Sequence, residues 1–141
     1  MSTQDIVIST DQSRLDIDFM YRSLTQETYW GKDFQLDEFK NALKHSLVFG
    51  LYLKSGEQIG FCRVITDYMT LAYITDTFIK KEYRGGTIVY QLLKDVNSHE
   101  SLKNVRRWLA VSKDIHPIAR KYGFEIIENP DIYLEKSKLK V

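Results

Sequence analysis

The sequence has almost no cysteine, since Cys62 is the only one among 141 residues. An intramolecular disulfide is therefore impossible, which excludes the disulfide-rich class of small proteins. Cys62 stands among the apolar residues Ile59, Phe61 and Val64, where a thiol usually serves as a small core side chain rather than a reactive group. We expect a buried Cys62 and a reducing, cytoplasmic compartment.

Long apolar runs are missing as well, and proline is scarce, with two residues. The longest apolar run, residues 47–53, has the length of a strand and falls well short of the ~20 residues that a membrane span requires. The first ten residues show no basic segment followed by an apolar core, so no secretion signal is predicted. With 43% hydrophobic and 28% charged residues, the composition is typical of a soluble globular protein with no membrane partner.

The chain also lacks a surplus of charge of either sign, because its formal net charge is +1. Proteins dedicated to nucleic acids typically carry a strong basic surplus for phosphate contacts, so we expect no nucleic-acid partner. The two halves differ, however: residues 1–70 carry a net charge of −3 and residues 71–141 a net charge of +4. An anionic ligand is therefore expected to bind in the second half.

Spacing patterns for other kinds of site and for a domain boundary are absent too. His45, His99 and His116 stand far apart in the sequence with no paired ligand spacing, so no metal is expected. There is no G-x-S-x-G motif for a serine nucleophile. Because the chain has no repeat, low-complexity tract or linker, residues 1–141 are predicted to form one domain.

What the sequence does contain is a regular succession of strand and helix patterns. Residues 6–8, 47–54, 58–66, 71–79, 105–111, 124–127 and 132–134 have the patterns of strands. Helices are predicted from the capping residues Ser9, Thr10 and Asp11 to about residue 25, over residues 33–45, after Gly86, and over residues 114–122 with Gly123 as a left-handed C-terminal cap. The result is a mixed α/β sheet in the order β-α-α-β-β-β-α-β-α-β, where the last β stands for a pair of short strands.

This order resembles the GNAT superfamily of N-acetyltransferases, and in particular its small bacterial members. The resemblance spans nearly the whole chain and is strongest in residues 60–67, 76–86, 107–109, 114–116 and 121–124. It implies the GNAT acyltransferase fold, with a V-shaped split between the fourth and fifth strands that holds acetyl-CoA. It also implies direct attack by an amine, usually a primary amine, in a ternary complex.

A helix N-terminus offers unpaired backbone N–H groups and about half a positive charge, so it can hold a pyrophosphate without dedicated side chains. The resemblance assigns this role to the turn of Arg84, Gly85, Gly86, Thr87, Ile88 and Val89, and it places the pantetheine arm along Thr77, Phe78 and Ile79. The family pattern has small residues where this chain has the β-branched Thr87 and Val89. We therefore expect weakened coenzyme A binding, whereas the alternative is a purely structural turn with Val89 in the core.

Asp76 is the candidate base. It alternates with Ala72, Ile74 and Phe78 on one face of its strand, and an acid on a mostly apolar face is expected to have a raised pKa. The alternative is a carboxylate satisfied by a neighbouring arginine or tyrosine.

The proton donor is less clearly marked. Many GNAT enzymes carry a tyrosine that protonates the departing thiolate, and the resemblance puts Ala119 in its place. Tyr122, about one turn further along the helix, is the candidate substitute; without it, slow transfer or a water-mediated acid is expected.

Tyr29 and Trp30 stand between the first two helices, the region that faces the acceptor in the GNAT fold. Their rings are predicted to wall an acceptor pocket, or alternatively to plug a loop. Asp67 and Tyr68 are further candidates for the acceptor rim. The sequence thus predicts an acetyltransferase that acts on a small-molecule or peptide amine. The alternative is a GNAT-shaped module that binds coenzyme A or another ligand without turnover. A homodimer is compatible with the sequence.

Overall fold

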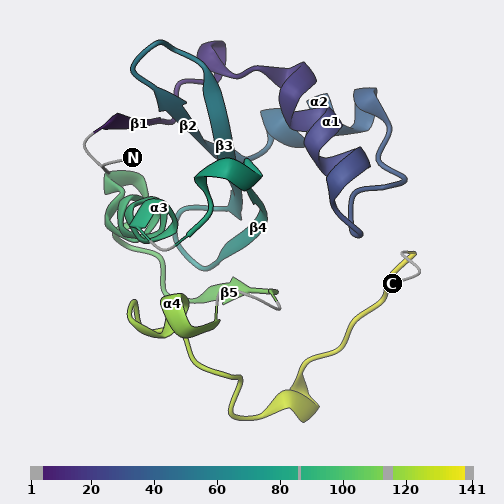
Figure 1. Ribbon diagram of the computed structural model, residues 1–141. Coiled ribbons are helices and arrows are strands. Elements are labelled where there is room, and N and C mark those ends of the chain that lie inside the picture. Colours follow the sequence, from purple (N-terminus) through teal and green to yellow (C-terminus); the bar gives the residue numbers. More distant parts are fainter. Residues whose placement is uncertain (1–4, 86, 113–115, 139–141) are drawn as a thin grey trace.

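The computed structural model describes residues 5–85, 87–112 and 116–138. Its centre is a five-stranded mixed sheet in the order β1-β2-β3-β4-β5 (Figure 1). The strands are β1 (Ile6–Ser9), β2 (Leu47–Leu53), β3 (Gln58–Thr66), β4 (Ala72–Ile79) and β5 (Trp108–Ala110). The first four pair antiparallel in sequence order, and β5 is parallel to β4.

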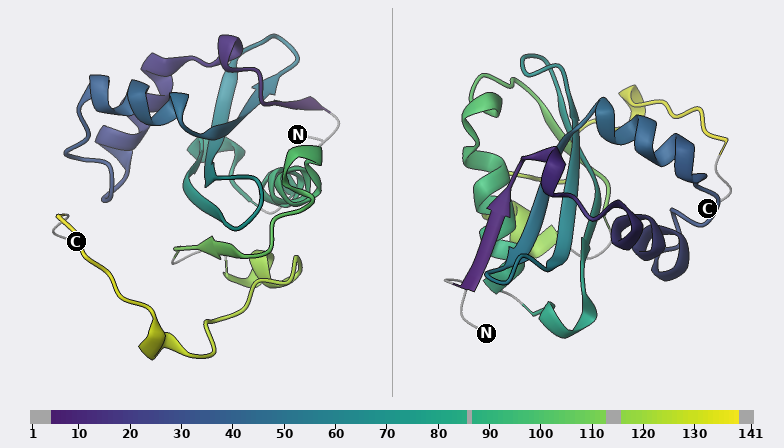
Figure 2. Two further views of the ribbon diagram at one scale, coloured as in Figure 1. Left: turned by 180° about the vertical axis from the view of Figure 1, so that it is seen from behind. Right: turned by 90° about the horizontal axis from the view of Figure 1, so that it is seen from above.

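Helices cover both faces of the sheet (Figure 2). On one face, α1 (Ile17–Glu27) and α2 (Leu36–Lys44) enclose a cluster that includes Phe19, Phe39 and Phe61. On the other, α3 (Thr87–Ser98) buries Ile88, Leu92 and Val96 against a second cluster, and α4 (His116–Arg120) lies beside β5. The mixed α/β fold expected from the sequence is confirmed. None of the helices in the described ranges has the length and apolarity that a bilayer crossing demands.

Cys62 is part of the cluster under α3 and has no exposed surface, as predicted. Burial raises the pKa of its thiol to about 12, because the thiolate would be cut off from water. The residue therefore serves as a core side chain.

The first helix begins later than predicted. Asp11 does act as a cap, but of a short 3-10 helix, Gln12–Arg14. Leu15 is extended, and α1 starts only after Asp16, whose side chain accepts a hydrogen bond from the backbone N–H of Phe19 at 3.0 Å. The sequence thus holds two N-capping residues, Asp11 and Asp16, one for each helix. Because Leu15 is extended, the single helix predicted from the apolar spacing is divided into two.

The predicted strands at residues 124–127 and 132–134 are not formed. After Gly123, whose φ of +89° confirms the predicted left-handed cap, the chain turns away from the sheet, and Pro130–Ile132 forms a 3-10 helix (Figure 1). A strand forms only where its backbone N–H and C=O groups can pair with a neighbouring strand, and among the described residues this segment pairs with none. The prediction of two strands from the apolar residues of this segment was therefore wrong.

The parallel pairing of β4 with β5 is short. It joins Ala72–Ile74 to Trp108–Ala110, so β5 is shorter than the predicted strand over residues 105–111. Beyond it, residues 75–79 of β4 continue without a partner from the described part of β5. The two strands therefore separate towards the end of β4 that leads into α3. Of the helix predicted at residues 114–122, residues 114 and 115 lie outside the described ranges, and α4 ends at Arg120.

Candidate active site

A β-bulge interrupts β4 where its pairing with β5 stops. The ladder between β3 and β4 shifts between Phe61 and Arg63, so that Asp76 and Thr77 together stand opposite Cys62. Asp76 has a φ of +46°, in the left-handed region that residues other than glycine seldom adopt. Such a conformation persists only where the surroundings hold it in place.

The bulge reverses the alternation of side chains along β4. Ala72 and Ile74 belong to the cluster under α3, whereas Phe78 belongs to the cluster under α1 and α2. The prediction that Asp76 shares one face with all three was therefore wrong, because an extra residue shifts the period of two.

The carboxylate of Asp76 is buried and has two strong donors. Arg63 Nε donates to Oδ2 at 2.8 Å, and Trp30 Nε1 donates to Oδ1 at 3.1 Å. The side chains of Asp76 and Arg63 are 5% and 11% exposed, and Arg63 also donates from Nη1 to Ser46 Oγ at 3.2 Å. This is the arginine partner that the second reading of Asp76 anticipated.

The loop after α1 carries Trp30 to this carboxylate. Gly31 fixes the loop's path, because a Cβ at this position would lie 2.5 Å from the carbonyl oxygen of Leu24 on α1. The Tyr29 and Trp30 rings meet edge to face at 5.0 Å, and 48% and 37% of these residues remain exposed. The structure thus brings Trp30 and Asp76 together, and the Tyr29 and Trp30 side chains beside the carboxylate are partly exposed.

The turn from β4 into α3 is held by Arg84, whose Nε donates to the carbonyl oxygen of Ile79 at 2.7 Å and whose guanidinium lies 5.2 Å from the Phe78 ring centroid. Gly85 has a φ of +128°, which side chains rarely permit. Thr87 opens α3 and is exposed. Gly86 lies outside the described residues.

Two further residues predicted for this turn point elsewhere. Ile88 is 4% exposed in the core, and Val89 packs against the same cluster. Val89 is thus a member of the core stripe, as the alternative reading had it. Of the residues predicted for the pantetheine arm, Thr77 directs its hydroxyl to Cys62 Sγ at 3.5 Å, while Ile79 is buried.

A hollow of about 570 Å³ lies between α3 and the end of α4. Thr87, Gln91 and Lys94 of α3 line one side, and Lys121 and Tyr122 line the other. The Gln91 Oε1 atom is buried and has no hydrogen-bond partner among the described residues. Tyr90 and Asp95 of α3 line it as well, so the hollow joins the start of α3 to two cationic side chains, one carboxylate and an unused acceptor.

The hydroxyl of Tyr122 donates to the carbonyl oxygen of Tyr90 on α3 at 3.2 Å. Ala119, at the position of the family's tyrosine, is 5% exposed. No group of three His, Cys, Asp or Glu side chains gathers as a metal site in the ranges that the structure covers.

Asp67 and Tyr68 lie in the turn that joins β3 to β4, before the first residue of β4, whereas Asp76 is the fifth residue of that strand. The Asp67 carboxylate accepts hydrogen bonds from the Thr70 hydroxyl and from the backbone N–H groups of Met69, Thr70 and Leu71. Its acceptor capacity is used within its own turn. The structure does not bring these two residues to the other candidates.

We expect Asp67→Ala to lower the melting temperature at pH 7. The hydrogen bonds from the Thr70 side chain and the local backbone hold the pKa of Asp67 below its ordinary value of 3.8. A depressed pKa contributes stability that is present above the unfolded-state pKa and is lost as the pH falls through the folded-state pKa. The difference in melting temperature between parent and variant should therefore shrink below pH 3.8. Calorimetric scans at a series of pH values measure this difference, and Thr70→Val, which removes the side-chain donor to Asp67, should show the same trend. A difference that stays constant as the pH falls well below 3.8 would contradict the role given to Asp67.

Several site residues were missed from sequence. Arg63 had a usable signal, since it is the one charged residue in a mostly apolar strand, and a charged side chain that is buried needs a partner. Lys94, Lys121 and Gln91 had none, because their proximity depends on how α4 packs against α3.

The model of the acetyltransferase (GNAT) family matches residues 15–124. A curated protein of Gibberella zeae, provisionally named an acetyltransferase, is 28% identical over 86% of this chain and 80% of its own length. A solved structure from Xanthomonas campestris, provisionally assigned to the GNAT family, is 38% identical, with a TM-score of 0.88 over 94% of this chain and 92% of that chain.

A GNAT acetyltransferase from Elizabethkingia anophelis was solved with acetyl-CoA bound. It is 18% identical and aligns with a TM-score of 0.65 over 94% of this chain and 88% of that chain, so the likeness is one of fold.

Proposed function

Because the chain belongs to the acetyltransferase (GNAT) family, we propose that it transfers an acetyl group from acetyl-CoA to an amine acceptor. One observation carries the proposal. Residues 75–79 of β4 run free of β5 and lead, through Gly85, to the first turn of α3 (Figure 1). An extended strand edge beside a helix N-terminus suits a ligand with amide groups at one end and phosphates at the other.

The residues present fit coenzyme A. Backbone groups of residues 75–79 that do not pair with β3 would pair with the pantetheine amides, except the Ile79 carbonyl oxygen, which accepts from Arg84. The start of α3 would hold the pyrophosphate. Lys94 and Lys121 would neutralise phosphate charge in the hollow, and the buried Gln91 Oε1 would accept an N–H from the ligand. The +4 charge of residues 71–141 supports the same placement.

Acetyl-CoA would supply an acetyl thioester, whose carbonyl carbon forms a bond to the acceptor nitrogen as its bond to sulfur breaks. The chain's part is to hold the acceptor in line with the β4 opening. Asp76 fixes the bulge through Arg63 and positions the indole of Trp30, so that the acceptor meets a rigid wall.

The acceptor that suits this wall is a primary amine in its cationic form. The exposed rings of Tyr29 and Trp30 attract an ammonium group through their π faces. Residues 1–70, which build this side of the opening, carry a net charge of −3. Both a small molecule and a peptide side chain meet these requirements.

That Asp76 receives the amine's proton stays a prediction. Both of its oxygens already accept hydrogen bonds, so it could act as base only by giving up Trp30 or Arg63. A positioning role agrees better with the geometry, with water as the proton acceptor. That Tyr122 protonates the thiolate also stays a prediction, because its hydroxyl must first leave Tyr90.

A coenzyme A-binding module without turnover is the second candidate. The engagement of Tyr122 with Tyr90 and the alanine at position 119 favour it, since neither residue offers a free proton for the leaving group. A positioned general acid is typically worth about 10²–10⁴-fold in rate. Slow transfer is therefore the expected behaviour of this chain.

Calorimetric titration with acetyl-CoA tests the cofactor site. We expect a dissociation constant between micromolar and millimolar, roughly −8 to −4 kcal/mol. Lys94→Ala and Lys121→Ala should weaken binding and flatten its salt dependence, whereas the control Lys40→Ala, on the exposed face of α2, should leave both unchanged. No heat at millimolar acetyl-CoA would overturn the proposal.

Single-turnover transfer to a panel of primary amines then separates the two candidates. Acetylated product in one turnover supports the enzyme, whereas saturable binding with no product above the rate without protein supports the binding module.

A further inference from the structure

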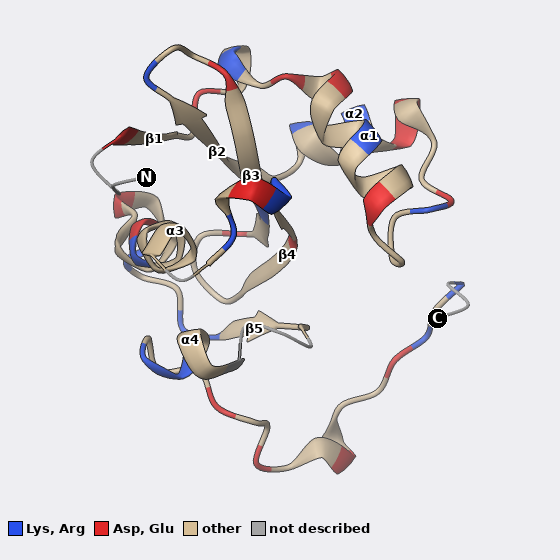
Figure 3. Ribbon diagram, in the orientation of Figure 1, with Lys and Arg blue, Asp and Glu red and all other residues tan. Residues whose placement is uncertain are grey.

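The three central strands of the sheet contain almost no charge. β2 has no Lys, Arg, Asp or Glu, β3 has only Arg63, and β4 has only Asp76, so these strands are mostly tan in Figure 3. Both side chains are largely buried and form the ion pair described above. A buried charge must also satisfy its remaining hydrogen-bonding capacity, so the further partners of this pair show what it holds in place.

The two further partners lie before and after the same helix. Trp30, which donates to Asp76, lies in the loop before α2, and Ser46, which accepts from Arg63, is the second residue after α2. Hydrogen bonds of 3.2, 2.8 and 3.1 Å thus join Ser46 to Arg63, Arg63 to Asp76 and Asp76 to Trp30. This four-residue network connects the two ends of α2 through β3 and β4.

The hydroxyl of Ser46 is fixed where Arg63 meets it. Its Oγ donates to the carbonyl oxygen of Ala42 on α2 at 2.7 Å, which leaves its lone pairs to accept from the guanidinium. From the other side, Gln12 Nε2 donates to the carbonyl oxygens of Leu43 and Ser46 at 2.8 and 3.2 Å. The end of α2 and the turn after it are therefore held independently of the arginine.

The arginine can transmit this position because its guanidinium is planar. Nε is bonded to Asp76 and Nη1 to Ser46, so the rigid group cannot rotate without breaking one of these two bonds. Its orientation in turn fixes the carboxylate, whose other oxygen accepts from the indole of Trp30. The orientation of the indole thus depends on the hydroxyl of Ser46 at the far end of α2.

Other hydrogen bonds attach the loop before α2 to α1. The Thr28 hydroxyl donates to the carbonyl oxygen of Leu24 at 2.6 Å, and the Tyr21 hydroxyl donates to that of Phe34 at 2.7 Å. These bonds hold the backbone of the loop on its helix. The bond to Asp76 has a different effect, because it sets how the indole faces β4.

We propose that Ser46 is a positioning residue for the amine acceptor. Through Arg63 and Asp76, its hydroxyl sets the orientation of Trp30 in the acceptor wall, which the rings of Tyr29 and Trp30 form. This assignment rests on the proposed acetyl transfer, in which the wall receives the ammonium group. Without the hydroxyl, one N–H of the largely buried arginine loses its partner, and the carboxylate and the indole can shift. The acceptor then binds more weakly, whereas the coenzyme A site at the start of α3 is unaffected.

Single-turnover transfer at saturating acetyl-CoA, measured over a range of amine concentrations, tests this role. In Ser46→Ala the half-saturating amine concentration should rise about fivefold, the factor that corresponds to one ordinary hydrogen bond. The dissociation constant of acetyl-CoA, measured by calorimetry, should not change. Ser46→Thr keeps the hydroxyl and should restore the parent's value. The matched control is Ser98→Ala at the end of α3, because the Ser98 hydroxyl makes the same kind of bond, to the carbonyl oxygen of Lys94 at 2.7 Å.

Tryptophan emission gives a second readout that requires no turnover. In the Trp108→Phe background Trp30 is the only tryptophan, and Ser46→Ala should increase its quenching by acrylamide, whereas Ser98→Ala should not. If the parent transfers no acetyl group, the proposed function fails, and the quenching still decides whether Ser46 holds the indole.

Three results would overturn the assignment of Ser46. The first is equal quenching in the parent and in Ser46→Ala, and the second is an unchanged half-saturating amine concentration. The third is an equal loss of affinity for acetyl-CoA, because it would indicate a general loosening of the fold and no selective effect on the acceptor wall.

Discussion

Replacing Asp76 by alanine is expected to lower the free energy of unfolding by about 3–5 kcal/mol, the usual cost of removing one partner from a buried ion pair. The change leaves Arg63, whose side chain is 11% exposed, without its carboxylate, and it removes the acceptor for Trp30 Nε1. Alanine is also poorly suited to a φ of +46°. Urea unfolding followed by circular dichroism measures the loss.

Two further variants separate charge from shape. Asp76→Asn keeps an acceptor for Trp30 and tolerates the left-handed conformation, so it should cost less than alanine. Adding Arg63→Met to Asp76→Asn should recover part of the loss, because the stranded charge is removed. A double variant as unstable as the sum of its single variants would show that the pair does not act as a unit.

The same variants decide the chemical role of Asp76. If Asp76 positions the site, Asp76→Asn should lower the rate of transfer by a similar factor at every pH from 6 to 9. If Asp76 is the base, the parent's dependence on one ionisation should vanish in the variant. An unchanged rate at all pH values would exclude both roles.

Thr87→Asp is expected to weaken coenzyme A binding by about 30–100-fold, or 2–3 kcal/mol, while it stabilises the protein. A carboxylate at the start of α3 interacts favourably with the helix dipole, by about 0.3–1 kcal/mol. It also repels a pyrophosphate bound at the same place. The affinity for coenzyme A, measured by calorimetric titration, should therefore fall, whereas the melting temperature should rise.

Thr87→Asn is the matched control, since it has the size of aspartate without the charge. Because Thr87 is exposed and contributes nothing to the core, neither change should disturb packing. Binding that tolerates aspartate at low salt would place the phosphates away from α3 and would contradict the proposed site.

The sequence was sufficient for the elements that depend on local patterns. The strands β2 and β3, the helix after Gly86 and the left-handed Gly123 follow from alternation, from helical spacing and from the freedom of glycine. The turn into α3 could be found for the same reason, because a strand that runs into glycine and then into an amphipathic helix is a local signal.

The geometry around Asp76 could not be predicted from the sequence, because it depends on one inserted residue in β4 and on partners that are distant in the sequence. The bulge at Asp76 has no marker of its own, since aspartate in a strand looks the same with or without it, yet it moves Asp76 and Phe78 to the other face. Arg63 and Trp30 meet Asp76 from elements thirteen and forty-six residues away. Sequence patterns indicate contacts only between residues a few positions apart, so neither contact could be predicted.

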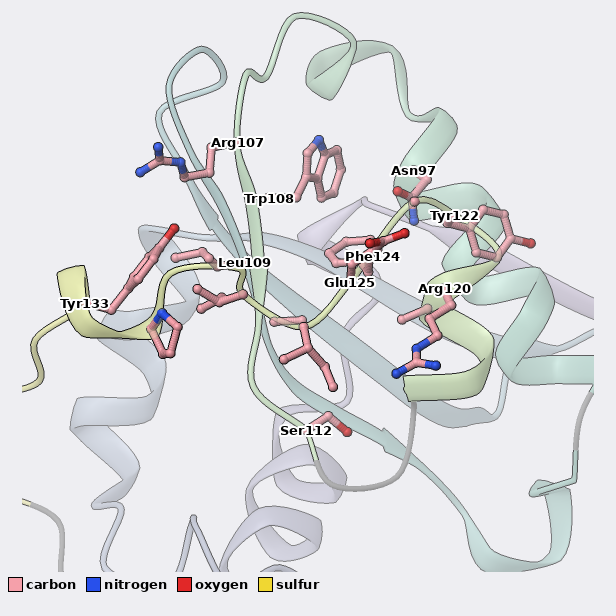
Figure 4. Close-up of a pocket in the computed structure, with 16 residues that line it drawn as sticks. Asn97, Arg107, Trp108, Leu109, Ser112, Arg120, Tyr122, Phe124, Glu125 and Tyr133 are labelled. Carbon is pink, nitrogen blue, oxygen red and sulfur yellow. The ribbon is translucent and has the colours of Figure 1, made fainter.

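The two tryptophans stand at two different places in the molecule. Trp30 is partly exposed in the proposed acceptor wall. Trp108 is in β5, where its ring packs edge to face on Phe124 at 6.2 Å and lines a cavity of about 590 Å³ between β5, α4 and the chain after α4 (Figure 4). The chain thus has one natural fluorophore at the acceptor wall and one at β5. Trp30→Phe leaves only the indole of β5, and Trp108→Phe leaves only the indole of the acceptor loop. Changes at these two places can therefore be followed separately by tryptophan emission, without any added label.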